Sequence, residues 1–210
     1  MDEEDEYMKL PPQILNQDTI NHIQINPGEF FVSQDKDIVI STLLGSCVAA
    51  CLYDPINEVL GMNHFLLSSN LPATSDPICI SQAGRYGVHA MELLINDMLK
   101  QGASRCNLKA KAFGGANILN FNLNSKFTSV GEVNACFVKE FLKNERIPLV
   151  GSDLHGKNGL VIHFTSSDYG VFKRKIRKSN AEAIEKREFN YWKEESLQQN
   201  NQKRDDSSLF

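Results

Sequence analysis

The feature that most constrains the fold is a series of short segments, rich in β-branched and aromatic residues, that begins near residue 30. Polar or glycine-bearing stretches separate these segments, which is the pattern of β-strands joined by turns. The candidate strands are 30–32, 37–44, 48–53, 59–67, 108–113, 147–150, 160–164 and 170–176. The chain is therefore predicted to have a β-rich core.

Two other segments carry apolar residues at helical spacing. The first covers 83–102, and Gly102 stands where a glycine commonly ends a helix. The second begins with Ser129 and Glu132 in the spacing of a capping box. Because strands and helices do not alternate regularly, we expect an α+β fold, with mixed or antiparallel sheets packed as a sandwich-like core and flanked by two or three helices.

Composition divides the chain into three parts. Residues 1–20 are acidic, contain two prolines and lack a lasting apolar period, so we expect a flexible acidic arm. Residues 21–178 contain every candidate strand and helix and are expected to form a single domain. Residues 179–210 are charged and rich in Gln and Asn, which predicts a polar tail that is partly helical or disordered.

Charge and hydropathy narrow the class of function. The formal net charge of −4 leaves no broad basic face for nucleic acid. The acidic start MDEEDEY does not resemble a secretory signal, and the longest apolar run, 42–53, is shorter than the roughly 20 residues that cross a membrane. We therefore expect a cytoplasmic protein that neither binds nucleic acid nor inserts into a membrane.

The cysteines carry the first indication of chemistry. There are five, an odd number without paired spacing, which favours reduced thiols. Cys47 follows Gly45 and Ser46 between two apolar segments, so a sharp bend could present its sulfur at a strand end. A histidine within hydrogen-bond reach would convert such a thiol to a nucleophilic thiolate, and His64 on the next strand is the best local candidate.

Two alternatives stand beside this hypothesis. Cys47 and His64 could be ordinary core residues, because free cysteine is most often a small buried hydrophobe. They could also bind a metal together with Cys51, but Cys47 and Cys51 are expected on or beside a strand, where their spacing would keep them far apart. We therefore expect no metal and no cofactor.

Longer motifs give a specific resemblance. TLLGSCVAACLYDP and GMNHFLL are followed in order by RYGVHAMELLINDMLKQGA, KAFGGANIL, VGEVN and IPLVGSDLHGKNGLVIHF. Together these motifs resemble the CheD family of chemoreceptor glutamine deamidases over residues 26–176. The resemblance implies that 21–178 is a deamidase domain with a cysteine-hydrolase fold of the CheD and cytotoxic necrotizing factor type.

The resemblance also implies catalytic roles. Cys47 matches the family's nucleophile, and His64 matches its base. The family's third member is a threonine six residues before the cysteine, where this chain has Ser41, followed directly by Thr42. Alternation along a strand would put Ser41 on the same face as Cys47 if the strand continued that far, so Ser41 is favoured and Thr42 is kept as the alternative.

Three further residues are candidates for the wall of a substrate site: Ser46, Gly114 and Gly115. Backbone amides at the glycine pair could lie near the reacting carbonyl, and amides around Cys47 could stabilise its negative charge. The plainer interpretation is that these residues only form turns that need small or flexible side chains.

The resemblance implies a protein-glutamine glutaminase that converts glutamines of methyl-accepting chemotaxis receptors to glutamate with release of ammonia. Cleavage of a glutamate methyl ester would use the same acyl chemistry. A CheC-type phosphatase is a further expected partner. The alternative hypothesis is an adaptor with little or no catalysis, which binds receptors or the CheC phosphatase.

Overall fold

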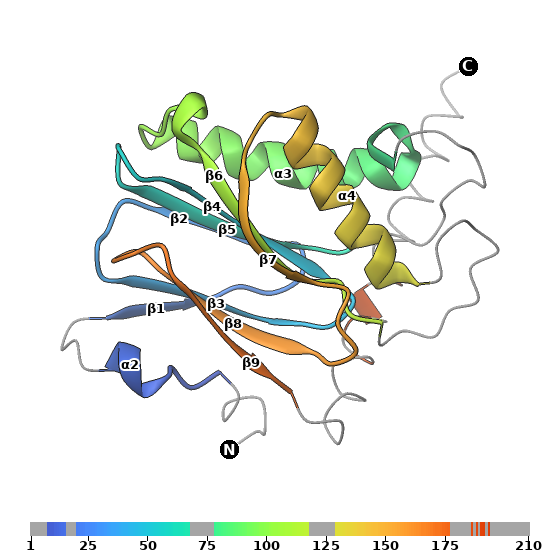
Figure 1. The fold of residues 1–210 in the computed structure, drawn as a ribbon, viewed down its shortest axis with the longest axis horizontal. Helices are drawn as coiled ribbons and strands as arrows, with labels where there is room; N and C mark the ends of the chain where they lie inside the picture. Colours follow the sequence, from blue (N-terminus) through green and yellow to red (C-terminus); the bar gives the residue numbers. More distant parts are fainter. Residues whose placement is uncertain are drawn as a thin grey trace.

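The computed structural model describes residues 8–15, 20–67, 78–117 and 129–176, and five residues of the C-terminal segment: Lys186, Glu188, Asn190, Tyr191 and Lys193. Two β-sheets lie one above the other, and two long helices cover the outer face of one of them (Figure 1). The predicted α+β class and sandwich-like core are confirmed.

The first sheet has four strands in the order β1-β3-β8-β9. They are β1 (Asn21–Gln24), β3 (Ile38–Leu44), β8 (Leu160–Thr165) and β9 (Val171–Lys175). β1 pairs with β3 in parallel, and the other neighbours are antiparallel. Strand β1 was not predicted, because its sequence NHIQ has little apolar or β-branched content.

The second sheet has five strands in the order β2-β5-β4-β6-β7. They are β2 (Phe30–Ser33), β5 (Val59–Phe65), β4 (Val48–Asp54), β6 (Lys109–Gly114) and β7 (Leu149–Leu154). Within this sheet of described strands, β6 and β7 pair in parallel and the other neighbours are antiparallel. Consecutive strands β3 and β4 belong to different sheets, so the chain crosses between the layers at residues 45–47.

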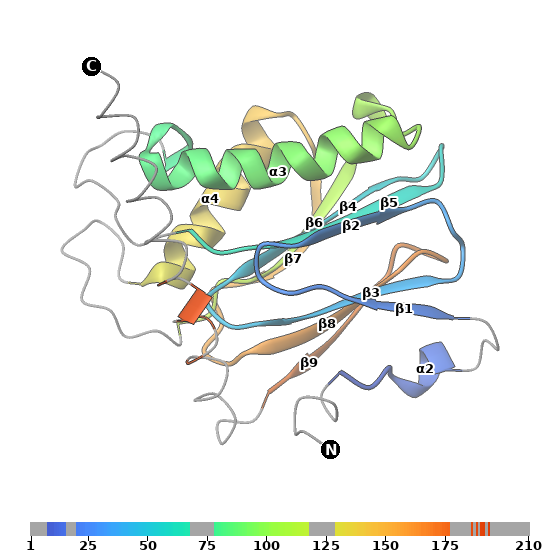
Figure 2. The same ribbon diagram turned by 180° about the vertical axis from the view of Figure 1, so that it is seen from behind.

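The helices are α3 (Gln82–Lys100), α4 (Val130–Asn144) and the short α2 (Pro12–Leu15), with 3-10 turns η1 (Ile78–Ile80) and η2 (Arg105–Asn107). The Ser129 hydroxyl accepts the backbone N–H of Glu132, as the capping box predicts. Gly102 follows α3 with φ +95, the conformation expected of a terminating glycine. Both long helices lie on the side of the second sheet away from the first (Figure 2).

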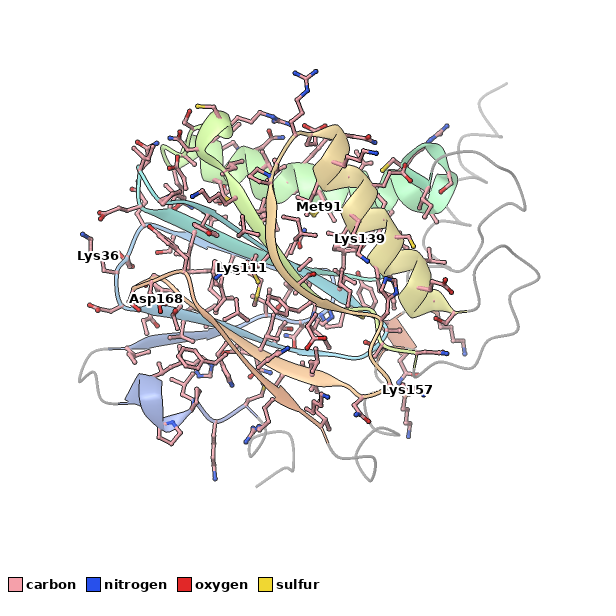
Figure 3. All side chains as sticks on the ribbon, in the orientation of Figure 1. Lys36, Met91, Lys111, Lys139, Lys157 and Asp168 are labelled. Atoms are coloured by element: carbon pink, nitrogen blue, oxygen red, sulfur yellow. The ribbon has the colours of Figure 1, made fainter. Side chains whose placement is uncertain are left out.

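Two apolar layers hold the three tiers together. Between the sheets, inward side chains of both sheets form one cluster, including Ile40, Leu44, Leu60, Met62, Ile162 and Phe164. A second cluster fills the space between the five-stranded sheet and the helices, including Val48, Leu52, Phe65, Met91, Leu94 and Phe137. Met91 of α3 is labelled at this layer in Figure 3. Burial of these side chains is the main stabilising contribution to the sandwich.

The far end of the sandwich is closed by contacts between a turn and the other sheet. Lys111 of β6 donates a hydrogen bond to the carbonyl of Tyr169, in the β8–β9 turn beside Asp168 (Figure 3). The rings of Tyr53 and Tyr169 stack with centroids 4.6 Å apart. The two sheets are therefore tied together at the end opposite the β3–β4 crossing.

The described part of the predicted N-terminal arm packs against the first sheet. Met8 and Ile14 are buried, and Met8 joins Val161 and Ile176 in a small apolar cluster. Residues 1–7 and 16–19 of the arm, and most of 179–210, lie outside the described residues. The division into arm, domain and tail stays a prediction. Among the described residues, no helix has the length and apolar character needed to span a membrane.

Candidate active site

Cys47 lies in the loop where the chain crosses from the first sheet to the second. Its side chain is fully buried among the apolar residues between the sheets. Two backbone hydrogen bonds from the residues after β6 hold this loop. Gly115 N–H donates to the Cys47 carbonyl at 2.7 Å, and Ala116 N–H donates to the Gly45 carbonyl at 2.8 Å. The position of the sulfur is therefore fixed by backbone contacts.

The glycine pair at the end of β6 packs directly against the cysteine loop, and both glycines have positive φ. A Cβ atom at Gly114, where φ is +106, would lie 2.2 Å from the Cys47 carbonyl oxygen. The Gly115 amide is already used by that same carbonyl. Gly114 and Gly115 thus allow a close approach of β6 to the cysteine loop, and the Gly115 N–H does not point to a substrate.

His64 lies on the inner face of β5, opposite Ala49 of β4. Its neighbours in the strand pattern, Leu60 and Met62, also face the first sheet. One ligand-type atom each of Cys47, His64 and Glu188 lie within 4.8 Å of one another. The sheet register therefore brings the predicted thiol and imidazole together.

Thr42, rather than Ser41, contacts the imidazole. The Thr42 Oγ1 lies 2.7 Å from His64 Nδ1 and donates to the Ile25 carbonyl at 2.8 Å. Because a hydroxyl has one proton, the Thr42 oxygen must accept from Nδ1–H of His64. This fixes the tautomer and makes Nε2 the ring nitrogen that can exchange a proton with the Cys47 thiol.

Ser41 lies on the opposite face of β3. Its Oγ is 2.7 Å from His163 Nδ1 and 2.7 Å from His22 Nε2, both outside the Cys47 loop. The expected alternation from Ser41 to Cys47 fails because β3 ends at Leu44 and the chain bends through residues 45–47. The inward face of β3 is the one that carries Thr42 and Leu44.

A carboxylate from the C-terminal segment covers the cysteine loop. Glu188 Oε1 accepts the N–H groups of Gly45 at 2.9 Å and Cys47 at 3.1 Å. Its Oε2 accepts the Ser46 N–H at 2.8 Å and the Ser46 hydroxyl at 2.6 Å. We call these four donors the amide cradle. Ser46, expected at the wall of the site, is one of its donors.

The cluster of Cys47, His64 and Glu188 could be taken for a metal centre. Each Glu188 oxygen, however, already accepts two hydrogen bonds, which uses the four acceptor positions of a carboxylate. His64 Nδ1 is held by Thr42. In this arrangement Glu188 has no lone pair to offer an ion, and the cradle explains its position without one.

Asn134 of α4 links the two loops that carry the thiol and the imidazole. Its side-chain NH₂ donates to the Ser46 carbonyl at 3.0 Å, and its Oδ1 accepts the N–H of Leu67, just beyond β5, at 2.8 Å. Asn134 is fully buried. Loss of this amide would leave buried backbone groups without partners, so we expect Asn134 to hold the two loops in position.

Neither Glu188 nor Asn134 was identified from the sequence. Glu188 stands in a charged segment that predicts a solvated tail, and its contacts join residues more than 140 positions apart in the chain. Asn134 carried one usable signal: it is a fully polar residue beside the apolar face of a predicted helix.

Cys51 is an example of a cysteine that is an ordinary buried core residue. It is buried on β4, and burial raises the pKa of its thiol far above the ordinary value, which Lys111 opposes only in part. A thiol in this environment does not form a thiolate at neutral pH. Cys47 differs from Cys51 in having a histidine and backbone donors around it.

A buried thiol, an imidazole of fixed tautomer and a hydroxyl that orients it make up the arrangement of cysteine-dependent acyl-transfer enzymes. Comparison with known proteins identifies a family. The family model described as CheD chemotactic sensory transduction matches residues 71–175, half of the chain. Two relatives cover most of the chain, and both are named as probable chemoreceptor glutamine deamidases.

The first, from Geobacter sulfurreducens, is 54% identical over 171 residues, which are 81% of this chain and 85% of the relative. The second, from Shewanella oneidensis, is 45% identical over 187 residues, 87% of this chain and 90% of the relative. Because the chain has 210 residues, matches of this length must span positions 47 and 64, whichever residue they begin at. This chain belongs to the CheD family.

Among solved structures, a Neisseria meningitidis protein of family DUF152 is similar with a TM-score of 0.43 and 10% identity, over 66% of this chain and 65% of that one. A likeness at this score does not bear on function.

Proposed function

We propose that this chain is a protein-glutamine deamidase that acts on the cytoplasmic part of chemotaxis receptors, with Cys47 as nucleophile, His64 as base and Thr42 as the residue that orients His64. The single observation that carries the proposal is the Thr42–His64 hydrogen bond beside the Cys47 sulfur. The names of the relatives support the choice of substrate.

The proposed reaction begins at the Cys47 thiol. His64 Nε2 takes the thiol proton, and the Cys47 thiolate attacks the carbon of a glutamine side-chain amide. The amide cradle receives the oxygen on which negative charge develops. His64 then protonates the departing ammonia, the C–N bond breaks, and a thioester remains. Water, deprotonated by His64, hydrolyses the thioester to a glutamate side chain and the free thiol.

Thr42 takes the place that the sequence favoured for Ser41. It accepts from Nδ1–H of His64, which leaves Nε2 as the ring nitrogen with a lone pair for the thiol proton and stabilises the imidazolium formed in the first step. Ser41 bonds two other histidines and has no part in this reaction.

The test is a direct assay. Purified protein is mixed with a receptor cytoplasmic fragment, and peptide mass spectrometry follows conversion of glutamine to glutamate, with the Cys47→Ala variant as the control. We expect conversion that depends on Cys47. Binding of the fragment without conversion would instead support an adaptor that contacts receptors or a CheC-type phosphatase.

The cellular setting is part of the proposal. All five cysteines lie within the described residues and none of them forms a disulfide, which suits a reducing cytoplasm. A CheC-type partner is proposed on the family assignment alone. Copurification with that phosphatase from cells would test it.

A further inference from the structure

Glu188 occupies the position that the reacting group of a substrate must take. Its two oxygens accept all four donors of the amide cradle, and one oxygen is within 4.8 Å of the Cys47 sulfur and of a His64 ring nitrogen. The same donors are needed for the oxygen of a substrate amide. Glu188 and a substrate therefore cannot be in the cradle together.

The burial of the three side chains also shows that a substrate cannot reach the sulfur in this arrangement. With Glu188 in place, Cys47 is 0% exposed, His64 is 2% exposed and Glu188 itself is 2% exposed. An amide carbon must approach the sulfur to within about 3–3.5 Å to react. The sulfur is closed to such an approach in the structure, and the Glu188 side chain is one of the groups that close it.

The Glu188 carboxylate is the same chemical group as the product of glutamine deamidation. A glutamate side chain is what remains when a glutamine amide has been hydrolysed, so the cradle holds Glu188 as it would hold the carboxylate at the end of a turnover.

The segment that carries Glu188 is seated by a second contact. Lys186, Glu188, Asn190, Tyr191 and Lys193 are helical, and a residue three positions beyond Glu188 lies on the same helix face. That residue is Tyr191, whose hydroxyl is 2.6 Å from the Tyr86 hydroxyl of α3.

Tyr191 also lies directly against Gly28, where an added Cβ would be 2.6 Å from its hydroxyl oxygen. Gly28 N–H bonds the His64 carbonyl. The segment thus contacts both sides of the site. The orange-red fragment of this segment lies near the start of α4, where the chain crosses between sheets (Figures 1 and 2).

We propose that the amide cradle is a binding site for a side-chain carboxylate presented by a helix, and that Glu188 is its intramolecular ligand, which makes the C-terminal segment a competitive inhibitor of the enzyme. The statement that Glu188 imitates the product rests on the proposed deamidase function. The statement that it closes the site rests on burial and hydrogen bonds alone.

A catalytic role for Glu188 would need it to act on the imidazole. Thr42 already holds Nδ1 of His64, and the four donors of the cradle already use both carboxylate oxygens. A residue that fills the place of the substrate oxygen hinders turnover. Removal of Glu188 therefore raises activity if it is an inhibitor and lowers activity if it is catalytic.

The first test measures access to the sulfur without reference to catalysis. Full-length protein is treated with iodoacetamide, and alkylation of Cys47 is followed by peptide mass spectrometry in wild type, Glu188→Ala and Asn190→Ala. We expect Glu188→Ala to react about tenfold faster at Cys47, since a site open only part of the time reacts in proportion to the open fraction. Asn190, exposed on the same helical segment, is the matched control and leaves the rate unchanged, while exposed Cys106 reports equal reagent in all samples.

The second test turns the inhibitor into a substrate. In the Glu188→Gln variant, the protein's own segment presents an amide to Cys47. Attack by sulfur, loss of ammonia protonated by His64 and hydrolysis by water would convert the introduced amide at position 188 to a carboxylate, detected as the mass gain of an amide that becomes an acid. We expect conversion in Glu188→Gln and none when Cys47→Ala is added.

The outcomes separate the two proposals. Equal Cys47 alkylation in wild type and Glu188→Ala, or lower activity of Glu188→Ala on the receptor fragment, overturns the inhibitor. Faster alkylation without any deamidation, either of the amide introduced at position 188 or of receptor, keeps the closed site and overturns the deamidase. Receptor conversion with the introduced amide left intact shows that the cradle does not hold Glu188 as a product.

Discussion

Strand β3 carries two hydroxyl–histidine pairs at adjacent positions, and they have opposite surroundings. Thr42 faces the second sheet and bonds His64 beside a thiol and four hydrogen-bond donors. Ser41 lies on the opposite face of the strand and bonds His163 and His22. The same two functional groups thus belong to the proposed active site on one face of β3, and on the other face they form a hydrogen-bonded cluster of one serine and two histidines.

The outer pair also has a histidine with a lowered pKa. Burial, with smaller contributions from the charges of His22 and Arg174, lowers the pKa of His163 to about 4. His163 therefore stays neutral at physiological pH, and its side chain makes the buried hydrogen bond with Ser41 inside the sheet.

The sharpest test of the comparison is removal of the thiol that distinguishes the inner pair. Cys47→Ala is expected to reduce receptor deamidation by at least about 10⁴-fold, because the nucleophile is lost while a small buried side chain remains. The rate of glutamate formation measures it. Cys51→Ala is the matched control, since Cys51 is equally buried on β4, and it should retain activity. Residual turnover in Cys47→Ala close to wild type would place the nucleophile elsewhere.

The next test removes each of the two hydroxyls in turn. Thr42→Ala should lower kcat by about 100-fold, because the general base His64 then loses the acceptor that orients it, while Ser41→Ala should change kcat by less than about threefold. Thr42→Ser should restore most of the activity because it keeps the hydroxyl. Steady-state kinetics on the receptor fragment decide it, and a larger loss in Ser41→Ala would return the orienting role to Ser41.

Asn134 tests how far the inner pair depends on its supports. Asn134→Ala should destabilise the fold by about 1–3 kcal/mol, because the Ser46 carbonyl and the Leu67 N–H lose a buried partner. It should lower kcat by about tenfold at temperatures where the protein is folded, since a small displacement of reacting groups is costly. Chemical denaturation and kinetics below the melting temperature separate the two effects. Unchanged kcat would limit Asn134 to stability.

The smallest expected effect is on the pH dependence of stability, through His163 of the outer pair. The unfolded state has a histidine pKa near 6.5, whereas folding lowers the pKa of His163 to about 4. The unfolded chain therefore binds more protons between these values, and the stability contributed at neutral pH is lost as pH falls from about 6.5 to about 4. Melting temperature against pH should fall less steeply for His163→Gln than for wild type. Parallel curves would contradict the assignment.

Most of the fold could be predicted because its signals are local. Strand β4, helix α3 and the capping box at Ser129 each follow from composition and spacing within a few residues. Strand β1 could not, since its pairing with β3 decides its conformation and its own sequence does not.

The site was predictable only in part, for a related reason. Cys47 and His64 lie close together in sequence on adjacent elements, so their pairing could be expected. The choice between Ser41 and Thr42 depends on where β3 ends, and element ends are the least reliable feature of any sequence pattern. Glu188 enters from a distant segment by contacts that no local pattern encodes.

The Thr42–His64 hydrogen bond joins residues of different sheets. Its length therefore depends on how the two sheets are aligned, which the apolar layer between them determines. A substitution in that layer, at Ile40 or Leu60 for example, could shift one sheet slightly against the other and misdirect the imidazole while the protein stays folded. The packing between the two sheets therefore also sets the orientation of the proposed base, His64.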